Sequence, residues 1–277
     1  MNLEELKSMA GDIRVDIVKM VAEAGSGHPG GSLSAADIMC ALYFGGVLKH
    51  DAENPKAEDR DRFLLSKGHA APALYATLAE AGYFPKEELA TLRKLHSRLQ
   101  GHPDCRKLPG VEASTGSLGQ GLSIAAGMAL GLRLNGSESS VFTLMGDGEC
   151  QEGQVWEAAM FAAHKGLDNL VAIVDHNHLQ IDGRIETVCS PEDLGDKFRS
   201  FGWQVFQCDG NDMEAILATL ESAKESRGGK PCVIVAETTK GKGVSFMEDQ
   251  AGWHGKAPNA EQTEQALAEL TANKEAK

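Results

Sequence analysis

Apolar residues recur along the chain with spacings that predict an alternation of helices and strands. Between residues 3 and 24, Leu3, Leu6, Ile13, Ile17 and Met20 follow a helical period that stops at Gly25. The segment 119–135 is rich in small apolar residues on nearly all sides, so we expect a buried helix there. Further helices are predicted over residues 34–45, where Ser34 would be the cap, and over 71–81, 87–95, 153–166, 212–227 and, as a peripheral helix that frays, 260–277.

Short continuous apolar runs between these helices predict strands. Four such runs cover residues 141–146, 170–175, 203–208 and 233–236. Because strands alternate with helices, the pattern indicates an α/β fold with a central parallel sheet covered by helices on both faces. We find no internal repeat and no low-complexity linker, so we expect a single domain over residues 1–277.

Composition excludes several classes of partner. Forty acidic against 27 basic residues give a formal charge of −13, and no long Lys/Arg block is present. This balance argues against nucleic acid and anionic membranes as partners. The first residues are acidic and amphipathic, and no apolar run approaches the length of a membrane span. Six cysteines are scattered without a C-x-x-C pair, which is typical of reduced thiols, so we expect a cytoplasmic protein.

Polar residues follow two of the predicted strands. Asp147 stands between Gly146 and Gly148 after the first run, and Asn177 follows the second. If the two strands are parallel neighbours, both side chains lie at carboxyl ends, where open α/β sheets bind ligands. A carboxylate and an amide oxygen suit Mg²⁺, which takes few protein ligands plus phosphate oxygens. The flanking glycines would admit a diphosphate, and the helix after Gly153 favours anions at its N-terminus. The alternative is an ordinary Gly-Asp-Gly turn.

His176 and His178 on either side of Asn177 raise the question of zinc. On a strand, residues i and i+2 share the face opposite the middle residue, so the two histidines cannot join Asn177 on one ion while the strand continues. No Cys or His lies nearby at a spacing typical of zinc sites. The sequence therefore does not predict zinc at Asn177.

Four of the nine histidines stand beside glycine or proline in expected loops: His28, His69, His102 and His254. Such loops bring an imidazole close to a ligand, where it donates to hydroxyls or phosphates and moves protons near neutral pH. A single loop histidine is usually an exposed residue without a functional role, but four together favour a site for a phosphorylated, polyhydroxylated substrate. Residues 25–30 also match the dinucleotide fingerprint G-x-G-x-x-G; a helix precedes them where that motif needs a strand, so we reject this interpretation.

The ordered set of these segments resembles transketolase over nearly the whole chain. The matching segments are Gly-Ser-Gly-His-Pro-Gly-Gly-Ser-Leu-Ser at 25–34, Leu-Ser-Lys-Gly-His-Ala at 65–70, Gly-His-Pro at 101–103, Thr-Gly-Ser-Leu-Gly-Gln-Gly at 115–121, Gly-Asp-Gly-Glu-Cys-Gln-Glu-Gly at 146–153 and Asp-His-Asn-His-Leu-Gln-Ile-Asp-Gly at 175–183. Each segment alone is weak, but the ordered set is specific. It implies the thiamine diphosphate-binding fold of the pyrophosphate domain.

The resemblance also implies roles for individual residues. The metal ligands for Mg²⁺, or Ca²⁺ as a substitute, would be Asp147, Asn177 and the carbonyl of Leu179. The sugar hydroxyls would face the catalytic histidines His28, His102 and His254. Thiamine diphosphate would contact His69, Gly116, Ser117, Leu118, Gly148, Asn177 and His254. Glu152 matches a glutamate that links two active sites across the dimer interface. Ser117 stands where the family often has proline, which changes loop stiffness only.

Transketolases that resemble this sequence continue into a pyrimidine-binding domain and a third domain, which we expect on a separate chain. The pyrimidine domain supplies the glutamate that activates the cofactor. The resemblance thus implies the N-terminal subunit of a split, pentose phosphate pathway transketolase, an α2β2 assembly that moves a two-carbon ketol unit from a ketose phosphate to an aldose phosphate. The alternatives are another thiamine diphosphate enzyme, such as an E1-type decarboxylase subunit or a transketolase for an unusual sugar, and a non-catalytic diphosphate-binding module.

Overall fold

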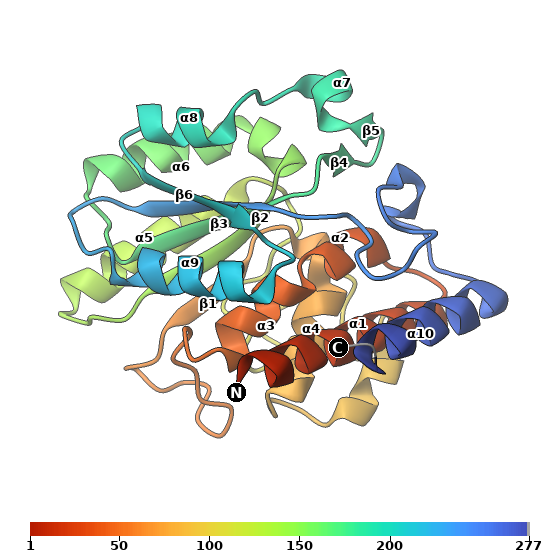
Figure 1. Ribbon diagram of the computed structural model, residues 1–277. Helices are drawn as coiled ribbons and strands as arrows, with labels where there is room; N and C mark the ends of the chain where they lie inside the picture. Colours follow the sequence, from red (N-terminus) through yellow and green to blue (C-terminus); the bar gives the residue numbers. More distant parts are fainter. Residues whose placement is uncertain (276–277) are drawn as a thin grey trace.

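Five parallel strands form the centre of the molecule (Figure 1). In the computed structural model, which describes residues 1–275, they lie in the order β1-β2-β3-β7-β6. A separate two-stranded antiparallel sheet joins β4 to β5. The strands are β1 (Arg62–Leu65), β2 (Val141–Gly146), β3 (Leu170–His176), β4 (Leu179–Gln180), β5 (Gly183–Arg184), β6 (Gln204–Asp209) and β7 (Cys232–Glu237).

The direction in which the chain builds the sheet reverses beyond β3. The chain adds β2 and then β3 beside β1, skips one position to form β6 at the far edge, and returns to insert β7 next to β3. Open parallel sheets bind ligands at such a reversal, outside the carboxyl ends of the strands. This topology places the ends of β2, β3 and β7 around one position.

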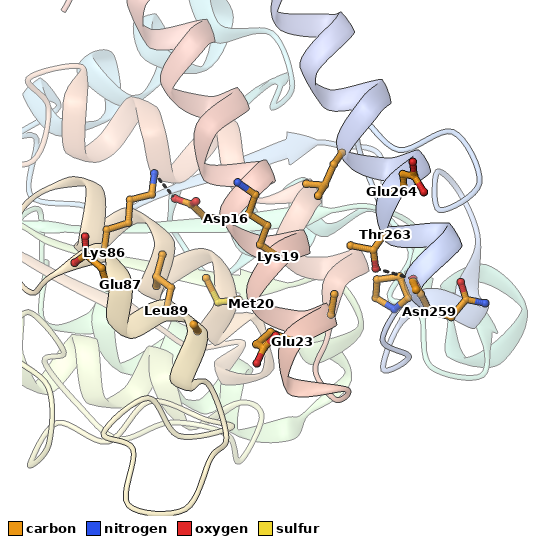
Figure 2. Close-up of a pocket in the computed structure, with 15 residues that line it drawn as sticks. Asp16, Lys19, Met20, Glu23, Lys86, Glu87, Leu89, Asn259, Thr263 and Glu264 are labelled. Carbon is orange, nitrogen blue, oxygen red and sulfur yellow. Dashed lines mark hydrogen bonds and ion pairs between the residues drawn. The ribbon is translucent and has the colours of Figure 1, made fainter.

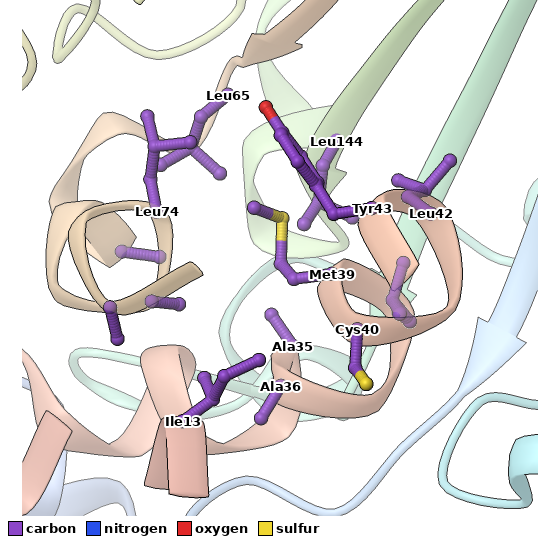
Figure 3. Packing of buried hydrophobic residues seen from close by; sticks show 14 of the residues in the cluster. Ile13, Ala35, Ala36, Met39, Cys40, Leu42, Tyr43, Leu65, Leu74 and Leu144 are labelled. Carbon is purple, nitrogen blue, oxygen red and sulfur yellow. The ribbon is translucent and has the colours of Figure 1, made fainter. Parts of the chain in front are cut away.

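One face of the sheet is covered by α1 (Leu3–Ala24), α3 (Ala36–Phe44), α4 (Ala71–Glu80) and α9 (Met213–Glu225), with α10 (Ala260–Glu275) lying against α1 (Figure 1). Helix α1 begins at a capping box, in which the Asn2 side chain accepts from the Glu5 N–H and Glu5 reciprocates, and it ends at Gly25 in the left-handed conformation. Figure 3 shows the core on this face, where Ile13 and Met39 from the helices meet Leu144 from the sheet.

The opposite face is covered by α5 (Gln120–Leu134), α6 (Gly153–His164) and α8 (Leu194–Ser200). Alternate residues of the strands point to the two faces: in β3, Val171 and Ile173 belong to the first core, whereas Ala172 and Val174 belong to this one. The remaining elements are α2 (Pro29–Ser34), α7 (Ile185–Cys189) and the 3₁₀ turns η1 (Gly68–Ala70), η2 (Lys86–Thr91), η3 (Gly148–Gln151) and η4 (Ala251–Trp253). Each described helix is too short or too polar to cross a membrane.

The structure confirms the parallel α/β class and the four strands expected from apolar runs, but it corrects several helices. Ser34 ends α2 and does not cap the next helix, which begins at Ala36. The segment 87–95 forms only the short turn η2. Helix α5 is buried on one face, whereas Leu134 at its end is 77% exposed. The edge strand β1 was not predicted, and residues 276–277 of the last expected helix lie outside the described part of the chain.

Candidate active site at the carboxyl ends of the strands

Asp147 and Asn177 lie at the carboxyl ends of two adjacent strands. Strands β2 and β3 pair so that Gly146 stands beside Asp175, and the two site residues follow directly. The buried Asp147 carboxylate accepts the N–H of Gly148 at 2.7 Å and that of His178 at 2.6 Å. The Asn177 amide oxygen accepts the N–H of Leu179 at 3.2 Å. These hydrogen bonds join Asp147 to the segment 177–179 that follows β3.

Burial raises the pKa of Asp147, and the negative charge of Asp175 raises it further. Two backbone N–H groups partly offset this effect. A buried carboxylate is stable in its charged form only with hydrogen bonds and a positive partner nearby. The donors here are a carboxylate, an amide oxygen and a backbone carbonyl, all hard oxygen ligands of the type that Mg²⁺ prefers. The chemistry of this set fits a hard divalent cation.

Lys67 and Asp175 form a buried ion pair beneath these oxygens. The Lys67 ammonium contacts one carboxylate oxygen of Asp175, and both side chains are at most 1% exposed. That oxygen also accepts from the Ser34 hydroxyl at 2.6 Å and the Asn177 amide at 3.2 Å, and Thr238 donates to the other oxygen. Burial alone would raise the pKa of Asp175, but Lys67 and these hydrogen bonds hold it below its usual range. The pair fixes the amide orientation of Asn177.

Lys240, which follows β7, is a second buried cation. Its ammonium donates to the Leu179 carbonyl at 2.9 Å and lies 2.9 Å from Nδ1 of His254. Burial lowers the pKa of Lys240 to about 8, and the charge of Lys67 contributes. Within residues 1–275, no carboxylate oxygen forms an ion pair with it. A buried ammonium without a paired carboxylate is suited to bind a ligand phosphate.

The four loop histidines come together in one cluster. His28 has ring-centroid distances of 5.4 Å to His69, 5.5 Å to His254 and 6.3 Å to His102, and His69 stacks on His254 at 5.1 Å. Nδ1 of His28 is buried and has no hydrogen-bond partner among the described residues. Because Lys240 contacts both His254 and the Leu179 carbonyl, the cluster and the oxygen donors belong to one continuous site.

The loop before α5 lies close to this cluster through glycines. A Cβ added to Gly68 would lie 2.6 Å from the Gly116 nitrogen, and one added to Gly116 would lie 2.9 Å from the His102 ring. Gly116 has φ +139°, a conformation that other residues rarely adopt. Ser117 is exposed and Leu118 half-buried on the same loop. These backbone approaches form a cradle that a side chain would fill.

Glu149, like Lys67, Asp175 and Lys240, had no role in our sequence-based predictions. Its buried carboxylate accepts the N–H of Gly119 at 2.9 Å and that of Gly146 at 3.0 Å, and the Ser66 hydroxyl also donates to it. It thus joins β1, β2 and the loop before α5. The exposed Glu152 lies beside this loop, because a Cβ on Gly119 would come within 2.7 Å of its Cβ. Lys240 stands beside Gly241, three residues after β7 ends at Glu237.

A surface pocket of about 890 Å³ lies away from the candidate site. Figure 2 shows that its lining includes Met20 and Glu23 of α1, Leu89 of η2, and Thr263 of α10. Asp16 at its edge contacts Lys86, and burial raises the pKa of Asp16 to about 6. None of the strand-end residues described above lines this pocket. A larger pocket of about 930 Å³ also contains none of them, so size does not locate the chemistry in this fold.

We expect the imidazoles of His28 and His254 to stay neutral at about pH 5, where an exposed histidine with an ordinary pKa near 6.5 is mostly protonated. Burial lowers the pKa of His28 to about 4 and that of His254 to about 3, and the neighbouring positive charges of Arg93 and Lys240 act in the same direction. An NMR titration of the ring carbon shifts, assigned with His28→Gln and His254→Gln, measures this. Midpoints near 6.5 for both rings would contradict it.

Comparison with known proteins places this chain in a family. The family model described as "Transketolase, thiamine diphosphate binding domain" matches residues 6–277. The chain is 45% identical over 266 residues to the 6-deoxy-6-sulfo-D-fructose transketolase subunit SqwG of Clostridium sp. (strain MSTE9), covering 96% of both chains. It is 43% identical to an apulose-4-phosphate transketolase subunit of Phocaeicola vulgatus, covering 98% of this chain and 95% of that one.

The solved structures agree with this comparison. The crystal structure of transketolase from Campylobacter jejuni subsp. jejuni superposes with a TM-score of 0.91 at 37% identity, covering 98% of this chain and 43% of that one. The chain therefore spans less than half the length of the solved transketolase that it matches. The fold and site define a thiamine diphosphate-binding domain. The chain belongs to the transketolase family, as a transketolase-type thiamine diphosphate-binding subunit.

Proposed function

We propose that this chain is the N-terminal subunit of a split transketolase that transfers a two-carbon ketol unit from a ketose phosphate to an aldose phosphate. The observation that carries the proposal is the continuity of the site. Oxygen donors at Asp147 and Asn177 connect through the Leu179 carbonyl and Lys240 to His254 and the other clustered histidines. The oxygen donors would suit a metal, Lys240 a diphosphate, and the histidines a polyhydroxylated substrate.

Asp147, Asn177 and the Leu179 carbonyl would hold Mg²⁺, with Ca²⁺ as a substitute. The diphosphate oxygens would complete the coordination, as is usual for Mg²⁺. The ammonium groups of Lys240 and Lys67 would lie close to the same phosphates and reduce their charge. Gly148 and the loop of Gly116, Ser117 and Leu118 would contact the cofactor with their backbones. Thiamine diphosphate, when bound, supplies the electron sink that ketol transfer needs.

The clustered histidines would bind and orient the sugar. Because burial keeps His28, His69 and His254 neutral near pH 7, each ring offers one N–H donor and one nitrogen acceptor. His28 and His102 can thus donate to sugar hydroxyls or accept a proton from one. His254, whose Nδ1 faces the Lys240 ammonium, can donate from Nε2, and His69 stacks beside it. An α-keto acid has few hydroxyls, so this cluster favours ketol transfer over decarboxylation.

We further propose that residues 1–277 act as the pyrophosphate-binding domain and that a second chain supplies the pyrimidine-binding domain and its glutamate, in an α2β2 assembly. Two relatives that match this chain over nearly their whole length are named as transketolase subunits, which supports this arrangement. So do Met160 and Phe161 of α6 and Leu134 of α5, which are large apolar side chains exposed at 57%, 40% and 77%. Glu152, exposed at the start of α6, would lie at the contact between two copies.

The sugar substrate has two candidates. The ordinary pentose phosphate substrates suit the histidine cluster, whereas an unusual sugar is favoured by the names of the relatives, which specify 6-deoxy-6-sulfo-D-fructose and apulose 4-phosphate. Both candidates use the same ketol transfer. The choice between them depends on groups that contact the far end of the sugar.

The test is to assay ketol transfer with the chain alone, with a candidate pyrimidine-domain chain alone, and with both mixed. Donors would be xylulose 5-phosphate, 6-deoxy-6-sulfo-D-fructose and apulose 4-phosphate, each with an aldose phosphate acceptor. We expect activity only in the mixture with thiamine diphosphate and Mg²⁺. Full activity of the isolated chain would overturn the split-subunit proposal. A mixture that assembles and binds the cofactor without transfer from any donor would favour a non-catalytic module.

A further inference from the structure

A group of two histidines and a glutamate, side chains of the kinds that ligate metals, lies beside the candidate active site. His176 ends β3 and Glu237 ends β7, and these two residues are direct partners in the strand pairing. Nδ1 of His176 lies 2.7 Å from one carboxylate oxygen of Glu237, and Nε2 of His178 lies 2.8 Å from the other. The ligand atoms of all three side chains lie within 4.8 Å of one another.

The backbone holds His178 toward this group. Its φ is +61°, an uncommon conformation for a residue other than glycine. The conformation accompanies donation of its N–H to Asp147 at 2.6 Å, and it brings the His178 ring to 4.1 Å from the His176 ring. Asn177 between them points the other way, toward Ser34 and Asp175. The two histidines therefore share a face that excludes Asn177.

We propose that His176, His178 and Glu237 bind one divalent transition-metal ion of the Zn²⁺ type, at a site separate from the oxygen donors of Asp147 and Asn177. Two imidazole nitrogens and one carboxylate form a ligand set typical of zinc sites that keep a position for water. The imidazoles favour Zn²⁺ over Mg²⁺, which takes oxygen ligands. The two neighbouring sites thus select different ions.

The surroundings of the three ligands fit this assignment. Nδ1 of His178 lies 2.9 Å from the Glu186 carboxylate, and metal-binding histidines almost always place their second nitrogen on such a group. Arg184 contacts the other oxygen of Glu186 at 3.6 Å, which leaves the first oxygen for His178. The Glu237 side chain is 51% exposed, so it can move outward from its direct contacts to admit an ion with its water ligand.

The ligands come from segments about 60 residues apart in the sequence, which explains why spacing did not predict the site. His176 and His178 alone give two ligands, and Glu237 joins them only because β7 is inserted beside β3. An ion bound here would also fix the segment 176–178, which carries Asn177 and the N–H that orients Asp147. Zinc binding would therefore steady the proposed magnesium ligands without replacing them.

The test uses the full chain after removal of metals with a chelator, in buffer that contains excess Mg²⁺ to saturate the oxygen donors. Calorimetry with Zn²⁺ should show saturable binding of one ion per chain. Co²⁺ should give visible absorption of a four- or five-coordinate ion. His176→Gln and His178→Gln should each weaken Zn²⁺ binding by at least about a hundredfold, and Glu186→Gln by about 10- to 100-fold.

Two controls make the result specific. The cluster of His28 and His254 could also take up Zn²⁺, so the double variant His28→Gln/His254→Gln should bind the ion as the unaltered chain does. His164→Gln, on α6, should also leave binding unchanged. Circular dichroism of every variant checks that the fold is kept. The proposal would be overturned if no saturable Zn²⁺ uptake were seen, or if uptake survived both His176→Gln and His178→Gln. It would also be overturned if binding were lost only in the His28/His254 variant.

Discussion

Replacing Lys67 by methionine is expected to lower the free energy of unfolding by about 3–5 kcal/mol, the usual cost of removing one partner of a buried ion pair. Lys67 is 1% exposed and Asp175 is fully buried. Methionine fills similar volume but leaves the Asp175 carboxylate with hydrogen bonds from Ser34, Thr238 and Asn177 only. Urea unfolding of the variant, followed by circular dichroism, measures the change.

A matched control separates burial from charge. Lys49 and Asp59 form an ion pair whose side chains are 61% and 76% exposed, so Lys49→Met should shift the urea midpoint far less than Lys67→Met does. Adding Asp175→Asn to Lys67→Met should recover part of the loss, since the uncompensated charge is then removed, and the double-mutant cycle gives the coupling energy. If Lys67→Met unfolds at the same urea concentration as the unaltered chain, this account of the pair is wrong.

The sequence predicted the sheet well where hydrophobic pattern determines it. Strands β2, β3 and β7 are buried on both faces, so each is a continuous apolar run that is easily recognised. The edge strand β1 was missed because it has only four residues and begins with Arg62. Helix α5 was predicted to be buried because it is apolar on nearly all sides; composition alone cannot tell which of those sides the rest of the chain covers.

Some residues of the candidate site could also be predicted from the sequence, and others could not. Asp147 and His28 were selected as candidates because polar residues between glycines or beside proline stand out from the apolar pattern. Lys67, Glu149 and Lys240 were missed because lysine and glutamate are almost always exposed, and sequence alone gives no measure of burial. Their burial is a tertiary effect: each is enclosed where the ends of several strands and loops meet.

Asp147→Asn is expected to weaken Mg²⁺-dependent binding of thiamine diphosphate by at least about a hundredfold, measured by calorimetry on the assembly with its partner chain. At about 4 Å and an effective dielectric constant of about 20, one unit charge contributes about 4 kcal/mol, which exceeds that factor. Asparagine keeps the shape of the side chain and removes the charge. Its amide group would also face one of the two N–H donors, from Gly148 or His178, so a modest loss of stability should accompany the binding defect.

The control is Asp168→Asn, which alters a carboxylate that accepts one backbone N–H, from Gly229 at 3.0 Å, outside the candidate site. This variant should bind cofactor and metal as the unaltered chain does. Raising the Mg²⁺ concentration should partly restore binding to Asp147→Asn, because the amide oxygen remains a weak ligand and Asn177 and the Leu179 carbonyl are unchanged. If cofactor binding depends on Mg²⁺ equally in both variants, the metal lies elsewhere. The proposal of one site that runs from the oxygen donors to the histidines would then be wrong.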